Sequence, residues 1–321
     1  MTILEFEKPI YELEAKIEEL KTIGHEKKIA IEPEVKSLQE KLDKMRREIY
    51  SHLTTWQRVQ IARHPDRPYT MDYIRMLTAD FQELHGDRKF ADDFALIAGL
   101  ARIDGVGVLM MGHQKGRDTT ENIKRNFGCA HPEGYRKAIR LMKLAEKMRI
   151  PIVILIDTPG AYPGIGAEER GQAQAIAENL RDMMMIKTPI VATVIGEGGS
   201  GGALGIGIAD RVCILQHAYY SVISPEGCAS ILWRSSTKAP EAAEALKITG
   251  EHLIKFGVVD EIIPEPLGGA HHDPVEVADN LKKSILKHIK ELSSLSTDDL
   301  TTSRYDKFRK IGEYQEEEKK S

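Results

Sequence analysis

Glycine is concentrated in one stretch in the middle of the chain, residues 195–207, which reads Ile-Gly-Glu-Gly-Gly-Ser-Gly-Gly-Ala-Leu-Gly-Ile-Gly. The stretch follows the short apolar run 189–194, whose β-branched residues are typical of a buried strand. We expect a sharp turn into a helix there, although each glycine inside a helix costs about 1 kcal/mol relative to alanine. Such a sequence offers bare backbone N–H groups to an approaching molecule, which suits anion binding. The alternative is a glycine-rich helix packed tightly on a neighbouring element.

A second loop rich in glycine and proline, residues 157–166, follows the apolar run 150–156. Strand-like runs at 150–156, 190–195 and 211–215 alternate with amphipathic stretches, which predicts an α/β fold with a parallel sheet. Ligands of such sheets bind at the carboxyl ends of the strands, where both glycine loops lie. We therefore expect the two loops to face one site.

Two nucleotide-binding motifs match these loops only in part. Gly196-x-Gly198-x-x-Gly201 has the spacing of a dinucleotide-binding turn, but Gln216 stands about 20 residues on, where an acidic residue is needed. Asp157-Thr-Pro-Gly160 resembles a GTPase switch, but no phosphate-binding loop precedes it. Neither motif predicts a nucleotide site.

A third motif keeps a hydrolase open as the alternative. Gly198-x-Ser200-x-Gly202 fits the nucleophile elbow of serine hydrolases, with a strand before it and a helix after it. Acids and histidines that could complete a catalytic triad follow in the chain: Asp210, His217, Asp260, His271 and His272.

The region from 115 to 140 is locally basic, with seven Lys or Arg residues against three acids, within a chain of net charge −4. It could contact phosphates or an acidic partner, or it could be a solvated helix face. The candidate contacts are Lys115, Arg117, Lys124 and Arg125.

The length and composition of the chain limit the classes of protein to which it could belong. A chain of 321 residues can bury a full core, and we find neither an export signal nor an apolar run long enough to span a membrane. Cys129, Cys213 and Cys228 are too scattered for a disulfide framework or a zinc knuckle. We therefore expect a cytoplasmic protein that holds no metal.

The chain divides into three parts by its pattern. Residues 1–63 predict a helical hairpin with narrow apolar stripes, which must pack either on its own domain or on another subunit. Residues 64–295 predict the α/β domain. Residues 296–321 form a polar tail that we expect to be partly disordered.

Several motifs together resemble the α subunit of bacterial acetyl-CoA carboxylase carboxyltransferase, in order from the hairpin to about residue 305. The resemblance implies an α/β fold of the crotonase type (ClpP/crotonase-like), a spiral of ββα units. The motifs that carry it are Gly112-His-Gln-Lys-Gly-Arg117, Asn126-Phe-Gly128, Pro132-Glu-Gly-Tyr-Arg-Lys137, Asp157-Thr-Pro-Gly-Ala-Tyr-Pro-Gly164, Ala167-Glu-Glu169, Gly196-Glu-Gly-Gly-Ser-Gly-Gly-Ala203 and Ile223-Ser-Pro-Glu-Gly-Cys-Ala229.

The resemblance implies transfer of a carboxyl group from carboxybiotin to acetyl-CoA, giving malonyl-CoA for fatty acid synthesis. Such a reaction needs stabilised oxyanions more than a strong side-chain base, and backbone N–H groups provide this. By resemblance, Gly201 and Gly202 form the oxyanion hole for the biotin ureido oxygen. Gly199 and Ser200, with Gly160 and Ala161 on the neighbouring loop, would line the substrate pocket.

The resemblance also implies partners. Biotin would arrive on a separate carrier protein, ATP would be used only by a biotin carboxylase component, and a zinc-containing β subunit would supply the acetyl-CoA side of the site. An α2β2 heterotetramer is expected, without a membrane, and the isolated chain should be inactive. Lys115, Arg117, Lys124 and Arg125 would contact CoA phosphate or the partner.

Overall fold

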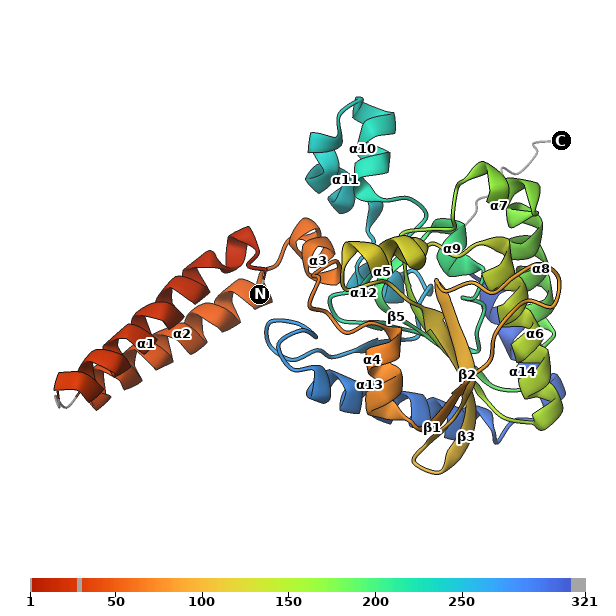
Figure 1. Cartoon of the computed structure of the whole chain (residues 1–321), viewed down its shortest axis with the longest axis horizontal. Helices are drawn as coiled ribbons and strands as arrows, with labels where there is room; N and C mark the ends of the chain where they lie inside the picture. Colours follow the sequence, from red (N-terminus) through yellow and green to blue (C-terminus); the bar gives the residue numbers. More distant parts are fainter. Residues whose placement is uncertain (1, 28–30, 313–321) are drawn as a thin grey trace, which may run out of the picture.

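A computed structural model of the chain describes residues 2–27 and 31–312, and within them eight strands form one sheet (Figure 1). The strand order is β1-β2-β3-β4-β5-β6-β8, and β7 pairs with the end of β5. β1, β2 and β3 pair antiparallel, whereas β3, β4, β5, β6 and β8 pair parallel, as the strand–helix alternation predicted. The strands are β1 Ala79–Glu83, β2 Leu96–Ile103, β3 Val106–His113, β4 Ile152–Thr158, β5 Ile190–Gly199, β6 Arg211–Leu215, β7 Tyr219–Ser221 and β8 Glu261–Ile263.

Helices cover both sides of this sheet. In Figure 1, α6 and α8 lie on one side of the sheet and α4 and α13 on the other. Every residue of β4 and of β5 is therefore buried, which explains their continuous apolar sequences. The helices are η1 Glu5–Glu7, α1 Lys8–Lys27, α2 Glu32–Ser51, α3 Thr55–Ala62, α4 Thr70–Leu77, α5 Thr119–Lys124, η2 Asn126–Gly128, α6 Pro132–Met148, α7 Ile165–Glu169, α8 Gln172–Met184, α9 Ser200–Leu204, α10 Pro225–Trp233, η3 Ser236–Lys238, α11 Ala239–Leu246, α12 Gly250–Lys255, α13 Pro274–Leu292 and α14 Thr297–Arg309. No helix among the described residues is long and apolar enough to cross a membrane.

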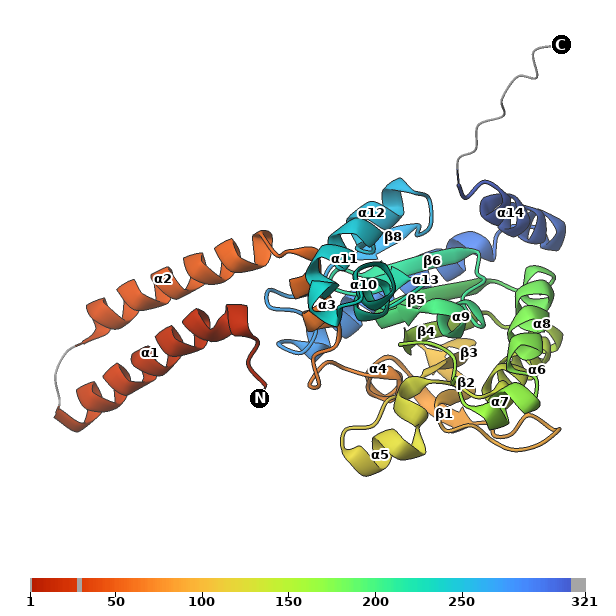
Figure 2. The same cartoon turned by 90° about the horizontal axis from the view of Figure 1, so that it is seen from above.

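The helices α1 and α2 form the predicted hairpin, which projects away from the sheet domain (Figure 2). Their apolar stripes bury each other in a small core of their own that also includes Ile61 of α3. Because this core is separate from the main one, α3 is the element that joins the hairpin to the α/β domain. The core residues are Ile10, Leu13, Ile17, Leu42, Tyr50 and Ile61.

The expectation of disorder from residue 296 onward is wrong for residues 297–309, which form α14. Ser296 caps this helix, and Leu300 is buried. Arg304 is only 1 % exposed and donates hydrogen bonds of 2.8 Å to both carboxylate oxygens of Asp210. The polar composition of the segment concealed these two anchoring residues. Residues 313–321 of the expected tail lie outside the described part of the chain.

Candidate active site

The two glycine loops lie against each other at the carboxyl ends of β4 and β5, as the topology predicted. Thr158 pairs with Gly198, and the backbones stay close beyond that point. A Cβ atom on Gly202 would lie 2.3 Å from the carbonyl carbon of Gly160 and 2.6 Å from the nitrogen of Ala161. No side chain fits in that space, so glycine at position 202 is what allows the loops to meet.

The expected turn into a helix is present, but the helix is short and does not extend through the whole glycine-rich stretch. β5 continues to Gly199 because residues 197–199 pair with β7, and the helix that follows, α9, ends at Leu204. The cost of glycine in a helix therefore applies to Gly201 and Gly202 and not to Gly205 or Gly207. The first N–H groups of a helix have no acceptor within it. Among the backbone hydrogen bonds that the described residues form outside regular helix and strand pairing, none uses the N–H of Gly201 or Gly202.

Ser200 sits at the exposed point of this turn with a φ of +50°, an unusual backbone angle for serine. Such an angle suits a nucleophile elbow. However, no hydrogen bond among the described residues joins the Ser200 hydroxyl to a histidine. The two acidic candidates are engaged elsewhere: Asp210 pairs with Arg304, and Asp260 with Lys307. The geometry therefore lacks the base that a serine hydrolase needs.

An ion-pair network lies beneath the two loops. The ammonium of Lys115 is 2.7 Å from Oδ1 of Asp157 and 2.7 Å from Oε2 of Glu197. The backbone N–H of Glu197 also donates to Oδ1 of Asp157, at 3.0 Å. Asp157 begins one loop and Glu197 begins the other, so Lys115 joins the two at their bases.

A second cation and a phenol complete the network. Arg63 at the end of α3 donates to Glu197 at 2.7 Å and to the hydroxyl of Tyr219 at 2.9 Å, and it also pairs with Glu226. The Tyr219 hydroxyl donates in turn to Glu197 at 2.7 Å. Burial alone would raise the pKa of the Glu197 carboxyl, but Lys115 and Arg63 lower that pKa to about 2. Glu197 is therefore a carboxylate at every pH at which the protein would work.

This network as a unit was not predicted from the sequence. Lys115 was expected only to contact phosphate or a partner, whereas the Lys115 side chain is 13 % exposed and lies between two carboxylates. A usable signal was present, because Lys115, Asp157 and Glu197 all lie at or just beyond the carboxyl ends of the neighbouring strands β3, β4 and β5. Arg63 carried no comparable signal, since it comes from the distant α3.

The other basic candidates lie nearer the surface. Arg117 donates to the carbonyl oxygens of Pro65 and Arg67, at 2.7 and 3.0 Å, and lies over the ring of Tyr69. Lys124 lies over the ring of Phe94, 4.6 Å from its centre. Arg125 donates to the carbonyl oxygen of Phe94 at 3.1 Å. These three cations contact neighbouring segments and remain accessible, unlike Lys115.

An apolar cavity of about 360 Å³ begins at Ser200, on the outer side of the glycine turn. Its wall is built by α9, β7, the segment from the end of α11 through α12, and the end of α14, and it is almost entirely apolar. The lining residues include Ser200 and Leu204 of the turn, Tyr220, Val222 and Phe308.

Comparison with solved structures identifies the class of fold. The transcarboxylase 12S structure with methylmalonyl-coenzyme A aligns with a TM-score of 0.55 at 18 % identity, over 79 % of this chain and 44 % of that one. This similarity confirms the expected crotonase-type fold and concerns the fold alone.

Sequence comparison identifies the family. The family model described as acetyl co-enzyme A carboxylase carboxyltransferase-like matches residues 3–312, and the chain therefore belongs to that family. The chain is 58 % identical, over 316 residues, to the acetyl-coenzyme A carboxylase carboxyl transferase subunit alpha of Methylococcus capsulatus, covering 98 % of each chain. It is 57 % identical, over 313 residues, to the protein of the same name from Thioalkalivibrio sulfidiphilus, again covering 98 % of each chain.

Proposed function

We propose that this chain is the α subunit of the carboxyltransferase component of an acetyl-CoA carboxylase, and that it helps to form malonyl-CoA for fatty acid synthesis. The observation that carries the proposal is the family match over nearly the whole chain, at 58 % identity to an α subunit. The position of the glycine turn at the sheet edge supports it independently, because that turn presents backbone donors beside an apolar wall.

When bound, carboxybiotin on its carrier protein supplies the carboxyl group that is transferred. The N–H groups of Gly201 and Gly202 would hold the biotin ureido oxygen as hydrogen-bond donors. Fixed donors aimed at a charge that develops during the reaction are worth roughly 10²–10³ in rate for each donor. Gly160 and Ala161 hold the turn from the opposite loop, Gly199 packs against Pro159 of that loop, and Ser200 lies on the exposed side of the turn.

The residues present fit a biotin ring in shape and polarity. A Cβ atom on Gly201 would lie 3.6 Å from Cδ1 of Ile176, an ordinary van der Waals distance, and Gly201 is itself partly exposed. The apolar cavity begins at the adjacent Ser200. A ring with one polar oxygen therefore has both hydrogen-bond donors and an apolar surface within reach of the turn.

The remaining parts of the complex belong to the same proposal. A zinc-containing β subunit supplies the acetyl-CoA side of the site, a biotin carboxylase uses the ATP, and two α chains assemble with two β chains. The exposed cations Arg117, Lys124 and Arg125 contact CoA phosphate or the β subunit. The three free cysteines agree with a reducing compartment, and we propose the cytoplasm.

The proposal is tested with the reaction run backwards. Malonyl-CoA decarboxylation in the presence of free biotin is measured for this chain alone, for a β subunit alone and for their mixture. We expect activity only in the mixture, because each chain supplies one half of the site. Equal activity in the chain alone, or none in a mixture that size-exclusion chromatography shows to be assembled, would contradict the proposal.

A further inference from the structure

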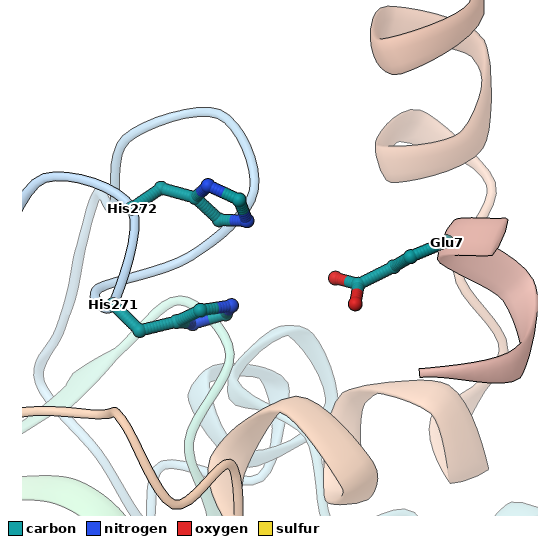
Figure 3. A group of neighbouring side chains, drawn as sticks. All are labelled: Glu7, His271 and His272. Carbon is teal, nitrogen blue, oxygen red and sulfur yellow. The ribbon is translucent and has the colours of Figure 1, made fainter. Parts of the chain in front are cut away.

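Three potential metal ligands meet where the N-terminal segment contacts the α/β domain. Glu7 ends η1, and His271 and His272 lie in the loop between β8 and α13. One oxygen of Glu7 and one ring nitrogen of each histidine all lie within 4.8 Å of one another. Figure 3 shows the carboxylate of Glu7 pointing toward both imidazole rings from the opposite side of the gap.

Within the described part of the chain, the two buried groups of this cluster, Glu7 and His271, lack the partners that burial usually requires. Glu7 is fully buried, yet no ion pair among the described residues includes it. The hydrogen bonds that it accepts from described residues come from neutral donors, the Tyr50 hydroxyl at 2.6 Å and the N–H of Leu4 at 3.0 Å. His271 is 6 % exposed, and neither of its ring nitrogens has a hydrogen-bond partner among the described residues. A buried carboxylate without a cation and a buried imidazole without a partner are both costly.

The local backbone holds the two histidines in place. Gly268 and Gly269 both have a φ of +101°, which only glycine adopts readily, and this turn brings the next residues toward Glu7. The ring of His64 stacks on that of His271 at 3.9 Å, which fixes the orientation of the buried imidazole. His272 is exposed and lines a cavity of about 380 Å³, which provides a route from solvent.

We propose that Glu7, His271 and His272 bind a divalent transition-metal ion of the zinc class. Two imidazole nitrogens and one carboxylate oxygen are a ligand set that Zn²⁺ accepts, with a further position left for water. The ion neutralises the buried carboxylate and joins η1, at the base of the α1–α2 hairpin, to the α/β domain. The proposal departs from our sequence-based expectation of a chain without metal.

A second cluster of potential metal ligands differs, because its carboxylate is already paired with a cation of the protein. Cys213, Glu261 and His288 also lie within 4.8 Å of one another. There, however, Glu261 already accepts hydrogen bonds from His288 at 2.5 Å and from the Lys287 ammonium at 2.8 Å. Because the Glu261 carboxylate already has a cationic partner in the protein, it needs no metal ion to neutralise it, unlike Glu7.

The test measures Zn²⁺ binding to the full-length, untagged chain without the β subunit. Equilibrium dialysis after treatment with a chelator gives the stoichiometry and affinity, and visible absorption of the Co²⁺-loaded chain reports the ligand geometry. The variant is His272→Ala, because this side chain is exposed and its removal leaves the core intact. The matched control is His52→Ala, another histidine with an exposed side chain, which lies at the end of α2.

We expect one Zn²⁺ per chain and unchanged binding in His52→Ala. Removing one of three ligands should weaken binding by more than the roughly 10- to 100-fold that loss of an outer-shell partner typically costs. Hydrogen exchange should also slow in η1 when Zn²⁺ is added to the wild-type chain and not to His272→Ala. Absence of binding by the wild-type chain, or binding of the same affinity by His272→Ala, would overturn the proposal. Neither result bears on carboxyl transfer, which is assayed separately.

Discussion

Replacing Lys115 by methionine tests whether the ion-pair network holds the two loops together. Methionine matches the apolar part of lysine but leaves Asp157 and Glu197 as neighbouring buried carboxylates without their shared cation. Removing one partner of a buried ion pair typically costs about 3–5 kcal/mol. Since domains are stable by only about 5–15 kcal/mol, we expect a large loss of stability, with Arg63 retaining part of the interaction with Glu197.

The same variant has a predicted pH dependence. In the wild-type chain the pKa of Glu197 is lowered from 4.5 to about 2, so its stabilising contribution is complete above about pH 4.5 and is lost as the pH falls toward 2. Without Lys115, we expect the pKa of Glu197 to rise above its ordinary value, because burial then dominates. The folded variant would then take up a proton more readily than the unfolded chain. The destabilisation should therefore be larger at pH 8 than at pH 5.

Urea unfolding of Lys115→Met and of the wild-type chain at both pH values measures this difference. The matched control is Lys143→Met, whose ion pair with Asp182 lies at the surface and should contribute at most about 1 kcal/mol. Destabilisation of Lys115→Met no greater than that of the control would refute the structural role of the network. A loss of the same size at pH 5 and pH 8 would refute the argument from the carboxylates.

Three further predictions follow from single contacts. Gly202→Ala should lower both the stability of the chain and the rate of carboxyl transfer, the rate by at least about 100-fold, because the added Cβ displaces an N–H donor. Gly201→Ala should lower the transfer rate but leave the free energy of unfolding unchanged within about 1 kcal/mol. Urea unfolding measures the first effect, and the activity assay of the assembled complex measures the second. Ser200→Ala should retain transfer, whereas a serine nucleophile would lose more than about 1,000-fold in rate. Arg304→Met should destabilise the chain by about 3–5 kcal/mol in urea, since it leaves Asp210 buried without its cation; a change below about 1 kcal/mol would show that α14 is not anchored.

The parts of the fold that could be predicted are those set by local sequence. The Asp104-Gly105 turn has φ values of +46° and +84°, as a two-residue hairpin turn requires, and it joins β2 to β3. The apolar runs of β4 and β5 are buried on both faces of the sheet, and their composition alone predicted them as strands. In both cases the signal spans only a few neighbouring residues.

The parts that could not be predicted depend on contacts between distant residues. Arg63 reaches Glu197 across 134 positions, and Arg304 reaches Asp210 across 94. A charged residue in a polar segment looks like any other exposed charge until its partner is known. This is why α14 was mistaken for part of a disordered tail, and why Lys115 was counted among charges available to phosphate.

The glycine-rich motif was expected either to present bare backbone to a ligand or to pack tightly on a neighbouring element. Each interpretation applies to different glycines of the motif. At Gly199 and Gly202 the molecule that approaches the bare backbone is the chain itself, because added Cβ atoms would lie 2.1 Å from the oxygen of Pro159 and 2.3 Å from the carbonyl carbon of Gly160. At Gly201 an added Cβ atom would lie 3.6 Å from Cδ1 of Ile176, an ordinary van der Waals contact, and the residue is partly exposed. Close packing of Gly202 thus fixes the turn that leaves Gly201 partly exposed. Substitutions at position 201 should therefore report on ligand approach, and those at position 202 on the joining of the two loops.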